Sequence, residues 1–151
     1  MHLTATADYA LRAVIEIADA HPKHVTAQQI SKTQDIPLKF IENILATLKR
    51  AGVVSAKRGV EGGYWLARPA SKITLADVIR AVEGPLANVR GTRPEHVKYH
   101  GAARPLREVW VALRVNLRGV LEAVTIEHIV TGKLPTVISR LTCRREAWLS
   151  H

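Results

Sequence analysis

Cysteine is nearly absent from this chain, which has one, Cys143, among 151 residues. One thiol excludes an intrachain disulfide framework and is typical of a reducing compartment, although pairing between two chains stays open. No apolar run approaches the roughly 18 residues that span a bilayer, and the N-terminus lacks the basic, apolar and small-residue order of a secretion signal. The sequence therefore predicts a cytoplasmic protein with no membrane-spanning segment.

Recognisable catalytic motifs are missing as well. The chain has no nucleophile turn with ordered serine, histidine and aspartate, no Walker-type phosphate loop and no metal-protease helix. It also has no internal repeat and no low-complexity tract. We therefore expect a protein that is not an enzyme.

Acidic residues are scarce relative to basic ones. The chain has 13 Asp and Glu against 22 Lys and Arg, which gives a formal net charge of +9. This excess favours a polyanionic partner, with nucleic acid first and an anionic membrane surface second. Apolar residues make up 47% of the chain, enough for the core of one domain with or without a dimerisation arm.

The first third of the chain has the spacing of three helices. Apolar residues recur on one helical face through residues 6–20. Thr26 followed by Gln29 is a capping-box pattern that starts a short second helix. Pro37 is favoured at the first position of a third helix, which Gly52 ends. The predicted buried stripe of that helix is Ile41, Ile44, Leu45 and Leu48.

Two short strands and a further helix follow. Residues 53–57 and 63–67 have strand propensity and flank a glycine-rich loop, which predicts a hairpin wing. Residues 75–82 predict another amphipathic helix. This order of elements predicts a winged helix-turn-helix DNA-binding domain in residues 1–84, which is a mostly α fold with a small two-stranded β wing.

The third helix of such a motif enters the major groove. Its outward residues Lys39, Glu42 and Asn43 are candidate base readers. Lys matches guanine acceptors, Glu the cytosine amino group and Asn adenine. Ordinary solvated surface is an equally open interpretation of each residue.

Basic residues at the end of this helix and in the wing are candidates for phosphate contact. Arg58 at the wing tip also suits an A·T-rich minor groove, with a salt link to Glu61 as the alternative. Thr26 and Gln28 suit a phosphate at a helix N-terminus. The complete set predicted to bind double-stranded DNA is Arg12, Thr26, Gln28, Pro37, Leu38, Lys39, Glu42, Asn43, Lys49, Arg50, Lys57, Arg58 and Gly59.

The second half of the chain predicts a connection and a dimerisation arm. Residues 85–104 lack clear periodicity and are expected to form a connecting loop. Dimerisation helices are expected in 105–132, followed by a C-terminal tail in 133–151. Apolar residues in 106–124 alternate spacings of four and three, which is typical of the seam of a coiled-coil-like helix. Such a helix packs on a second copy or, alternatively, on its own subunit. The predicted dimer interface is Leu106, Trp110, Leu113, Leu117, Val120 and Val124.

Several stretches resemble the Rrf2 family of bacterial winged-helix regulators. The resemblance covers about residues 1–86, and the long helix with Val124-Thr125 after it resembles the family's dimerisation arm. It implies a homodimer that represses or activates transcription at pseudo-palindromic promoter sites. The stretches that carry it are Asp8 to Ala13, Ile36-Pro37 with Phe40 and Ile41, Ala51 to Val54, Arg58-Gly59 with Gly62-Gly63-Tyr64, and Ile79 to Pro85.

Well-studied members of this family place three cysteines in the segment that here spans 85–105 and bind an iron–sulfur cluster there. This segment contains no cysteine, and one distant thiolate does not supply the usual ligation. We therefore expect no iron–sulfur cluster and no other cofactor. His96 and His100 lie four apart without a third ligand nearby, so no metal site is predicted either.

The signal is left open by the sequence. We expect it to act at residues 88–104, which link the domain to the seam. Cys143 beside Arg144 and Arg145 is either a redox-reactive thiol or an incidental one in the tail.

Two other functions compete with a sequence-specific regulator. A winged-helix protein-interaction module would show little salt-dependent affinity for duplexes. A nonspecific architectural protein would ignore operator sequence.

Overall fold

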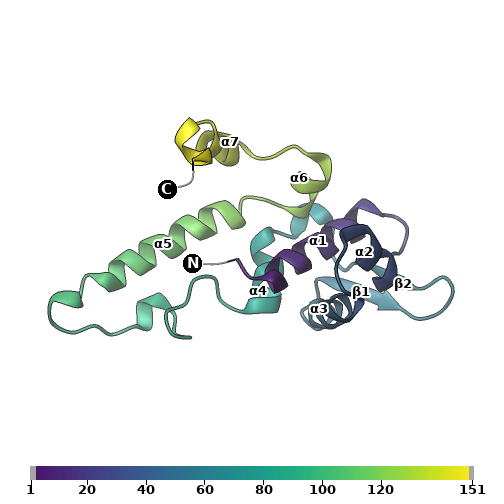
Figure 1. Cartoon of the computed structure of the whole chain (residues 1–151), viewed down its shortest axis with the longest axis horizontal. Coiled ribbons are helices and arrows are strands. Elements are labelled where there is room, and N and C mark those ends of the chain that lie inside the picture. Colours follow the sequence, from purple (N-terminus) through teal and green to yellow (C-terminus); the bar gives the residue numbers. More distant parts are fainter. Residues whose placement is uncertain (1–2, 150–151) are drawn as a thin grey trace.

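The computed structural model describes residues 3–149 and confirms a mostly helical chain with a two-stranded wing (Figure 1). The first part of the chain, called the body below, has the four helices α1 (Ala5–Asp19), α2 (Ala27–Gln34), α3 (Leu38–Arg50) and α4 (Leu75–Glu83). The wing, between α3 and α4, has the two strands β1 (Val54–Lys57) and β2 (Gly63–Leu66). The remaining helices are α5 (Leu106–Leu121), α6 (Ile126–Thr131) and α7 (Thr136–Thr142). Short 3₁₀ turns are η1 (Ala70–Lys72), η2 (Pro94–His96), η3 (Gly101–Ala103) and η4 (Arg145–Trp148). No helix within 3–149 is both long and apolar enough to cross a membrane.

The core lies where α1 packs against α3 and α4. The buried face of α1 consists of Ala7, Ala10, Ala13, Val14 and Ile17, and its small alanines let the neighbouring helices approach closely. The predicted stripe of α3 is confirmed, because Ile41, Ile44, Leu45 and Leu48 are all buried. Burial of these apolar side chains fixes the angle at which α3 crosses the domain.

The helix-turn-helix is set by its cap and its turn. Thr26 caps α2 with the predicted capping box, in which the Gln29 N–H donates to Thr26 Oγ1 at 3.2 Å. Asp35 at the end of α2 has φ 52°, a left-handed conformation that turns the chain sharply. Ile36 is then buried, and Ser31 Oγ donates to its carbonyl at 2.6 Å. Pro37 occupies the cap of α3 rather than its first turn.

The wing is an antiparallel hairpin in which Val54 pairs with Leu66 and Lys57 with Gly63. The outer edge of β2 also pairs with the chain just before α2, because the Tyr64 N–H donates to the Val25 carbonyl at 2.8 Å. Gly63 has φ 130°, and a Cβ there would lie 2.9 Å from the Val25 oxygen. The close pairing therefore requires glycine and ties the wing to the start of the helix-turn-helix.

A second short pairing joins the body to the C-terminal half. The Leu75 N–H donates to the Val124 carbonyl at 2.9 Å, and the Ile126 N–H donates to the Ile73 carbonyl at 2.9 Å. Thr74 and Thr125 face each other in this bridge and cap α4 and α6. The pairing therefore holds the segment after α5 against the start of α4.

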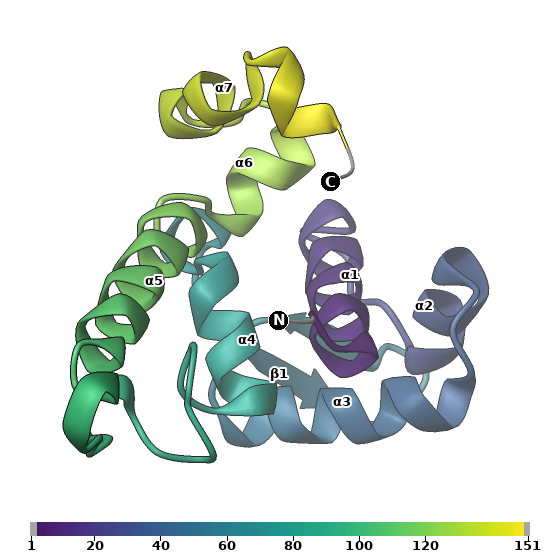
Figure 2. The same cartoon turned by 60° about the vertical axis from the view of Figure 1, so that its left-hand side comes forward.

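Helix α5 projects away from the body as a long arm (Figures 1 and 2). It has no buried residue, and Leu106, Val109 and Val115 are 40%, 53% and 58% exposed. The prediction that Val124 continues the seam is wrong. The helix ends at Leu121, and Val124 is buried by its own chain, where its carbonyl binds α4.

The connecting segment is irregular, as expected, but it is packed. Pro94 and Val97 are buried, and η2 lies against α5. The Trp110 indole N–H on α5 donates to the Tyr99 hydroxyl at 2.9 Å. The C-terminal segment, expected to be a tail, contains α7 and η4, since Val137 and Ile138 after Pro135 supply a half-buried apolar face.

Candidate nucleic-acid interface

Helix α3 presents one flank to solvent along the edge of the domain, below α1 and α4 in Figure 2. Lys39, Glu42 and Asn43 are all exposed there, whereas Leu38 is half-buried. The two faces separate because the buried stripe occupies only one side of the helix. The structure therefore places the three predicted base readers together on the surface, where side chains of these types can reach base edges.

Phe40 is a surface residue that the sequence analysis did not single out as a site residue. It is 57% exposed on the flank of α3, and its ring and that of Tyr9 form a T-shaped pair at a centroid distance of 6.2 Å. An exposed aromatic ring beside the predicted base readers suits apolar contact with a thymine methyl group. The sequence already indicated this exposure, because Phe40 lies outside the predicted buried stripe of α3.

The end of α3 and the wing carry the four predicted phosphate-binding cations. Lys49 and Arg50 lie in the last turn of α3, and both are exposed. Lys57 ends β1 and Arg58 follows at the wing tip, also exposed. No ion pair joins Arg58 to Glu61 in the described residues 3–149, so the alternative salt link has no support in this structure.

The wing tip is a tight glycine turn. Gly59 has φ 108°, and the Gly62 N–H donates to its carbonyl at 2.9 Å. A Cβ on Gly62 would lie 2.3 Å from the Lys57 oxygen, so only glycine fits there. The turn holds Arg58 and Val60 at the surface.

Lys23 and His24 join the base of the wing, although they are distant from it in sequence. They line one surface hollow together with Lys57. His24 stacks on Trp65 of β2 at 4.4 Å between ring centroids, and its Nδ1 lies 3.2 Å from the Glu61 carbonyl. No local pattern links these residues, because the pairing of Val25 with Tyr64 brings them together.

Two predicted residues of the first helices are engaged within the chain. The Thr26 hydroxyl accepts the Gln29 N–H, whereas Gln28 is exposed beside it. N–H groups in the first turn of a helix have no intrahelical partner and suit a phosphate. Arg12 donates from Nε to Gln34 Oε1 at 2.7 Å and also to the Gln34 carbonyl, so its guanidinium joins α1 to the end of α2.

The residues of the connecting segment do not fit an iron–sulfur cluster. Residues 85–105 contain no cysteine, and Cys143 lies at the end of α7. His96 and His100 are exposed, and only His96 lies in a helical turn. Within residues 3–149 no group of three or more His, Cys, Asp or Glu side chains is arranged to hold a metal ion.

Comparisons with known proteins agree with this geometry. The family model described as "Rrf2: Iron-dependent Transcriptional regulator" matches residues 3–132. The HTH-type transcriptional regulator Rv1287 of Mycobacterium tuberculosis is 39% identical over 93% of this chain and 88% of its own. The HTH-type transcriptional regulator CymR of Bacillus subtilis is 30% identical over 87% of this chain and 91% of its own. The solved structure of CymR, described as the global cysteine regulator of that organism, has a TM-score of 0.74 at 27% identity and covers 88% of this chain and 98% of that one.

Proposed function

This chain belongs to the Rrf2 family of DNA-binding transcriptional regulators, and we propose that it acts as a homodimer on pseudo-palindromic promoter sites without an iron–sulfur cluster. The observation that carries the proposal is the exposed polar flank of α3 beside a cationic wing. One element suits base edges and the other suits phosphates.

The assignment of contacts follows the chemistry of each position. Lys39, Glu42 and Asn43 read bases in the major groove, with Phe40 as an apolar contact beside them. The cations of α3 and the wing, joined by Lys23, bind phosphates. Gln28 and the first N–H groups of α2 hold one further phosphate.

The homodimer is supported by the surface of α5. Leu113, Leu117 and Val120 line a cavity of about 720 Å³, whose other wall includes Ala7 and Ile79 of the body. Apolar walls on both sides of so large a space suit an inserted helix, and a second copy supplies one in its own α5. Two α3 helices in a two-fold dimer then meet two half-sites one or more helical turns apart.

Cluster-free action is supported by the ligand chemistry of the connecting segment. The family's cluster needs thiolates in residues 85–105, where this chain has none. DNA binding is therefore expected in protein that has been stripped of metal.

Selection of bound sequences from random duplex DNA tests the proposal, using purified metal-free protein at two salt concentrations. An inverted repeat with half-sites about 10 base pairs apart, or a multiple of that spacing, is the expected result. The unselected pool is the control for sequence bias. Strong salt-dependent binding without a motif would identify an architectural protein, and weak binding with a shallow salt slope would identify a protein-interaction module.

A further inference from the structure

Four arginines from three separate elements line one surface pocket of about 450 Å³. Arg80 comes from α4, Arg93 precedes η2, and Arg114 and Arg118 come from α5. Residues 84–86 and Glu95 complete the wall. The pocket therefore lies at the junction of the DNA-binding body, the connecting segment and the dimerisation arm.

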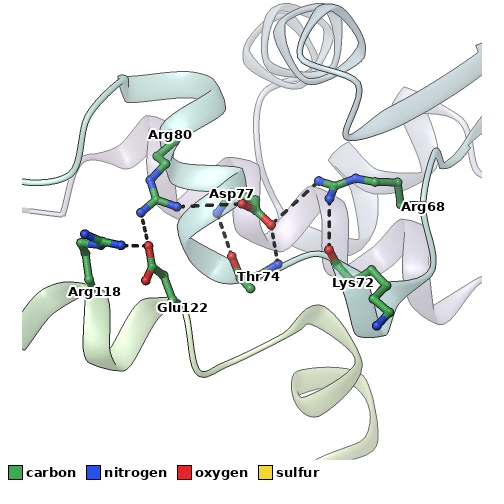
Figure 3. Close-up of polar contacts among 7 residues, drawn as sticks. All are labelled: Arg68, Lys72, Thr74, Asp77, Arg80, Arg118 and Glu122. Carbon is green, nitrogen blue, oxygen red and sulfur yellow. Dashed lines mark hydrogen bonds and ion pairs between the residues drawn. The ribbon is translucent and has the colours of Figure 1, made fainter.

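Two carboxylates partly neutralise these arginines. Glu122 accepts a hydrogen bond from Arg80 and another from Arg118 Nε at 3.0 Å, so the two helices meet at one carboxylate (Figure 3). These hydrogen bonds, the one from Arg80 first, hold the pKa of Glu122 below its ordinary value. A hydrogen bond from its own backbone, followed by that from Arg114, does the same for the pKa of Glu95.

The compensation is incomplete. Four arginines line the pocket, and two carboxylates, Glu95 and Glu122, pair with three of them, which leaves an excess of two positive charges. Asp77 lies 4.0 Å from Arg80, but it is also 3.9 Å from Arg68 (Figure 3). The charges of Asp77 and Arg68 cancel, so counting both residues leaves the excess of two positive charges unchanged. Like charges gathered in one pocket repel each other unless an anion offsets them.

Two of the arginines have unused donors. The Arg114 Nε is buried and has no hydrogen-bond partner among residues 3–149. Arg93 is exposed and makes no ion pair within the same range. Arg114 lines the pocket, and within residues 3–149 its guanidinium donates only from Nη1, to Glu95, so it has donors left for a ligand.

We propose that this pocket binds a small anion with two or more negative charges, carried by phosphate or carboxylate groups. Guanidinium groups present planar forks of N–H donors that match the oxygens of both groups. The volume lies within the range of small-molecule sites, and the excess of two positive charges sets the valence. A monovalent anion leaves one of these charges unbalanced.

Because of the position of the pocket, anion binding is also expected to affect DNA binding. This second step rests on the proposed function. An anion held by Arg80 and Arg118 competes with Glu122 for the same donors and so alters the link between α4 and α5. The angle of α5 to the body sets the distance between two α3 helices in the dimer, and hence the fit to two half-sites. Anion binding is therefore expected to change affinity for the operator.

Titration calorimetry of the full chain without DNA tests the site, with pyrophosphate as the phosphate probe and citrate as the carboxylate probe. Sodium chloride and acetate at matched ionic strength are the controls. We expect saturable binding of at least one multivalent probe, and the probe that binds distinguishes the two sources. Absence of saturable binding by both probes overturns the proposal.

Arg93→Ala is the decisive variant, because Arg93 makes no ion pair within residues 3–149 that the substitution would remove. The variant is expected to weaken binding about tenfold or more, with an unchanged melting temperature in the absence of probe. Arg140→Ala on the exposed face of α7 is the matched control and should bind as the wild type does. Equal weakening in both variants would show nonspecific charge attraction and overturn the site.

Operator binding with and without the saturating probe tests the effect on DNA separately. The affinity should change for the wild type and stay constant for Arg93→Ala. Unchanged wild-type affinity overturns the regulatory effect alone. If the chain binds no duplex, the proposed function fails while calorimetry still decides the site. If Arg93→Ala weakens operator binding without any probe and no anion binds, the arginines are DNA contacts instead.

Discussion

Arg12 of α1 donates from Nε to Gln34 Oε1 at 2.7 Å and so joins the first helix to the end of α2. The guanidinium also binds the Gln34 carbonyl and forms an ion pair with Asp8 at 3.2 Å. Gln34 in turn donates to Glu16 of α1. A residue that composition and helical position made a candidate for DNA contact thus holds the helix-turn-helix against α1.

Replacing Arg12 by Ala is expected to lower the free energy of unfolding by about 1 kcal/mol, since it removes charge-assisted hydrogen bonds from a side chain that is one-third exposed. Urea denaturation measures the change. Asp8→Asn is the control, because that surface ion pair contributes little. A positioning role also predicts an unaltered salt slope of DNA binding for Arg12→Ala. A slope that falls by about one would identify a phosphate contact instead.

Replacing Arg58 by Ala is expected to weaken binding to all duplexes and to lower the slope of log affinity against log salt by about one unit. The reason is that Arg58 is exposed at the wing tip and has no acidic partner among residues 3–149. Fluorescence anisotropy over a salt series measures both quantities. Arg140→Ala changes the net charge equally and should leave the slope as it is. Equal slopes in wild type and Arg58→Ala would remove the wing from the interface.

Replacing Asn43 by Ala is expected to relax sequence preference at one position of each half-site, with a loss of about 1–3 kcal/mol against the preferred base. Asn43 is exposed in the middle of α3, and an amide matches adenine through two hydrogen bonds. Competition binding with single-base variants of the selected operator measures the effect. Affinity for nonspecific duplex is the internal control and should not change. An unaltered base preference would contradict the placement of Asn43 at a base edge.

The elements of the first half could be predicted because local signals agree with the tertiary fold. The Thr26–Gln29 capping box, the stripe of α3 and the glycine turn of the wing each specify their element from neighbouring residues. The second half follows from contacts that are distant in sequence. Val124 continues the apolar spacing of α5, yet its carbonyl pairs with Leu75, which ends the helix early.

The same distinction holds for the surface sites. Lys39 and Asn43 were predicted from position on one helix, whereas Lys23 reaches the wing only through the bridge between Val25 and Tyr64. The arginine pocket draws on three elements and has no linear pattern at all. Spacing along the chain therefore finds sites built on one element and misses those assembled by packing.

Glu122 gives a pH-dependent link between α4 and α5. Hydrogen bonds from Arg80 and Arg118 lower its pKa from the ordinary 4.5, so the ionised form is the one stabilised by folding. The contribution is complete above pH 4.5 and is lost as the pH falls through the lowered pKa. The difference in free energy of unfolding between wild type and Glu122→Gln should therefore narrow as the pH is lowered from 7 to below 4.5.

Chemical denaturation at a series of pH values measures this difference. Glu127→Gln is the control, because Glu127 lies exposed on α6 and makes no ion pair within residues 3–149. Its difference from wild type should stay constant with pH. A difference for Glu122→Gln that is also constant would show that the carboxylate does not join the two helices in solution.

Replacing Leu117 by Glu is expected to convert the proposed homodimer into monomers. Leu117 lines the apolar cavity between α5 and the body, and an ionised carboxylate placed among buried apolar groups is strongly unfavourable. Light scattering coupled to size-exclusion chromatography measures the mass. Val115→Glu is the matched control, since Val115 is 58% exposed on the opposite side of the same helix, and this variant should remain dimeric. Dissociation by Val115→Glu with a dimeric Leu117→Glu would place the partner on the other face of α5, and a monomeric wild type would contradict the homodimer itself.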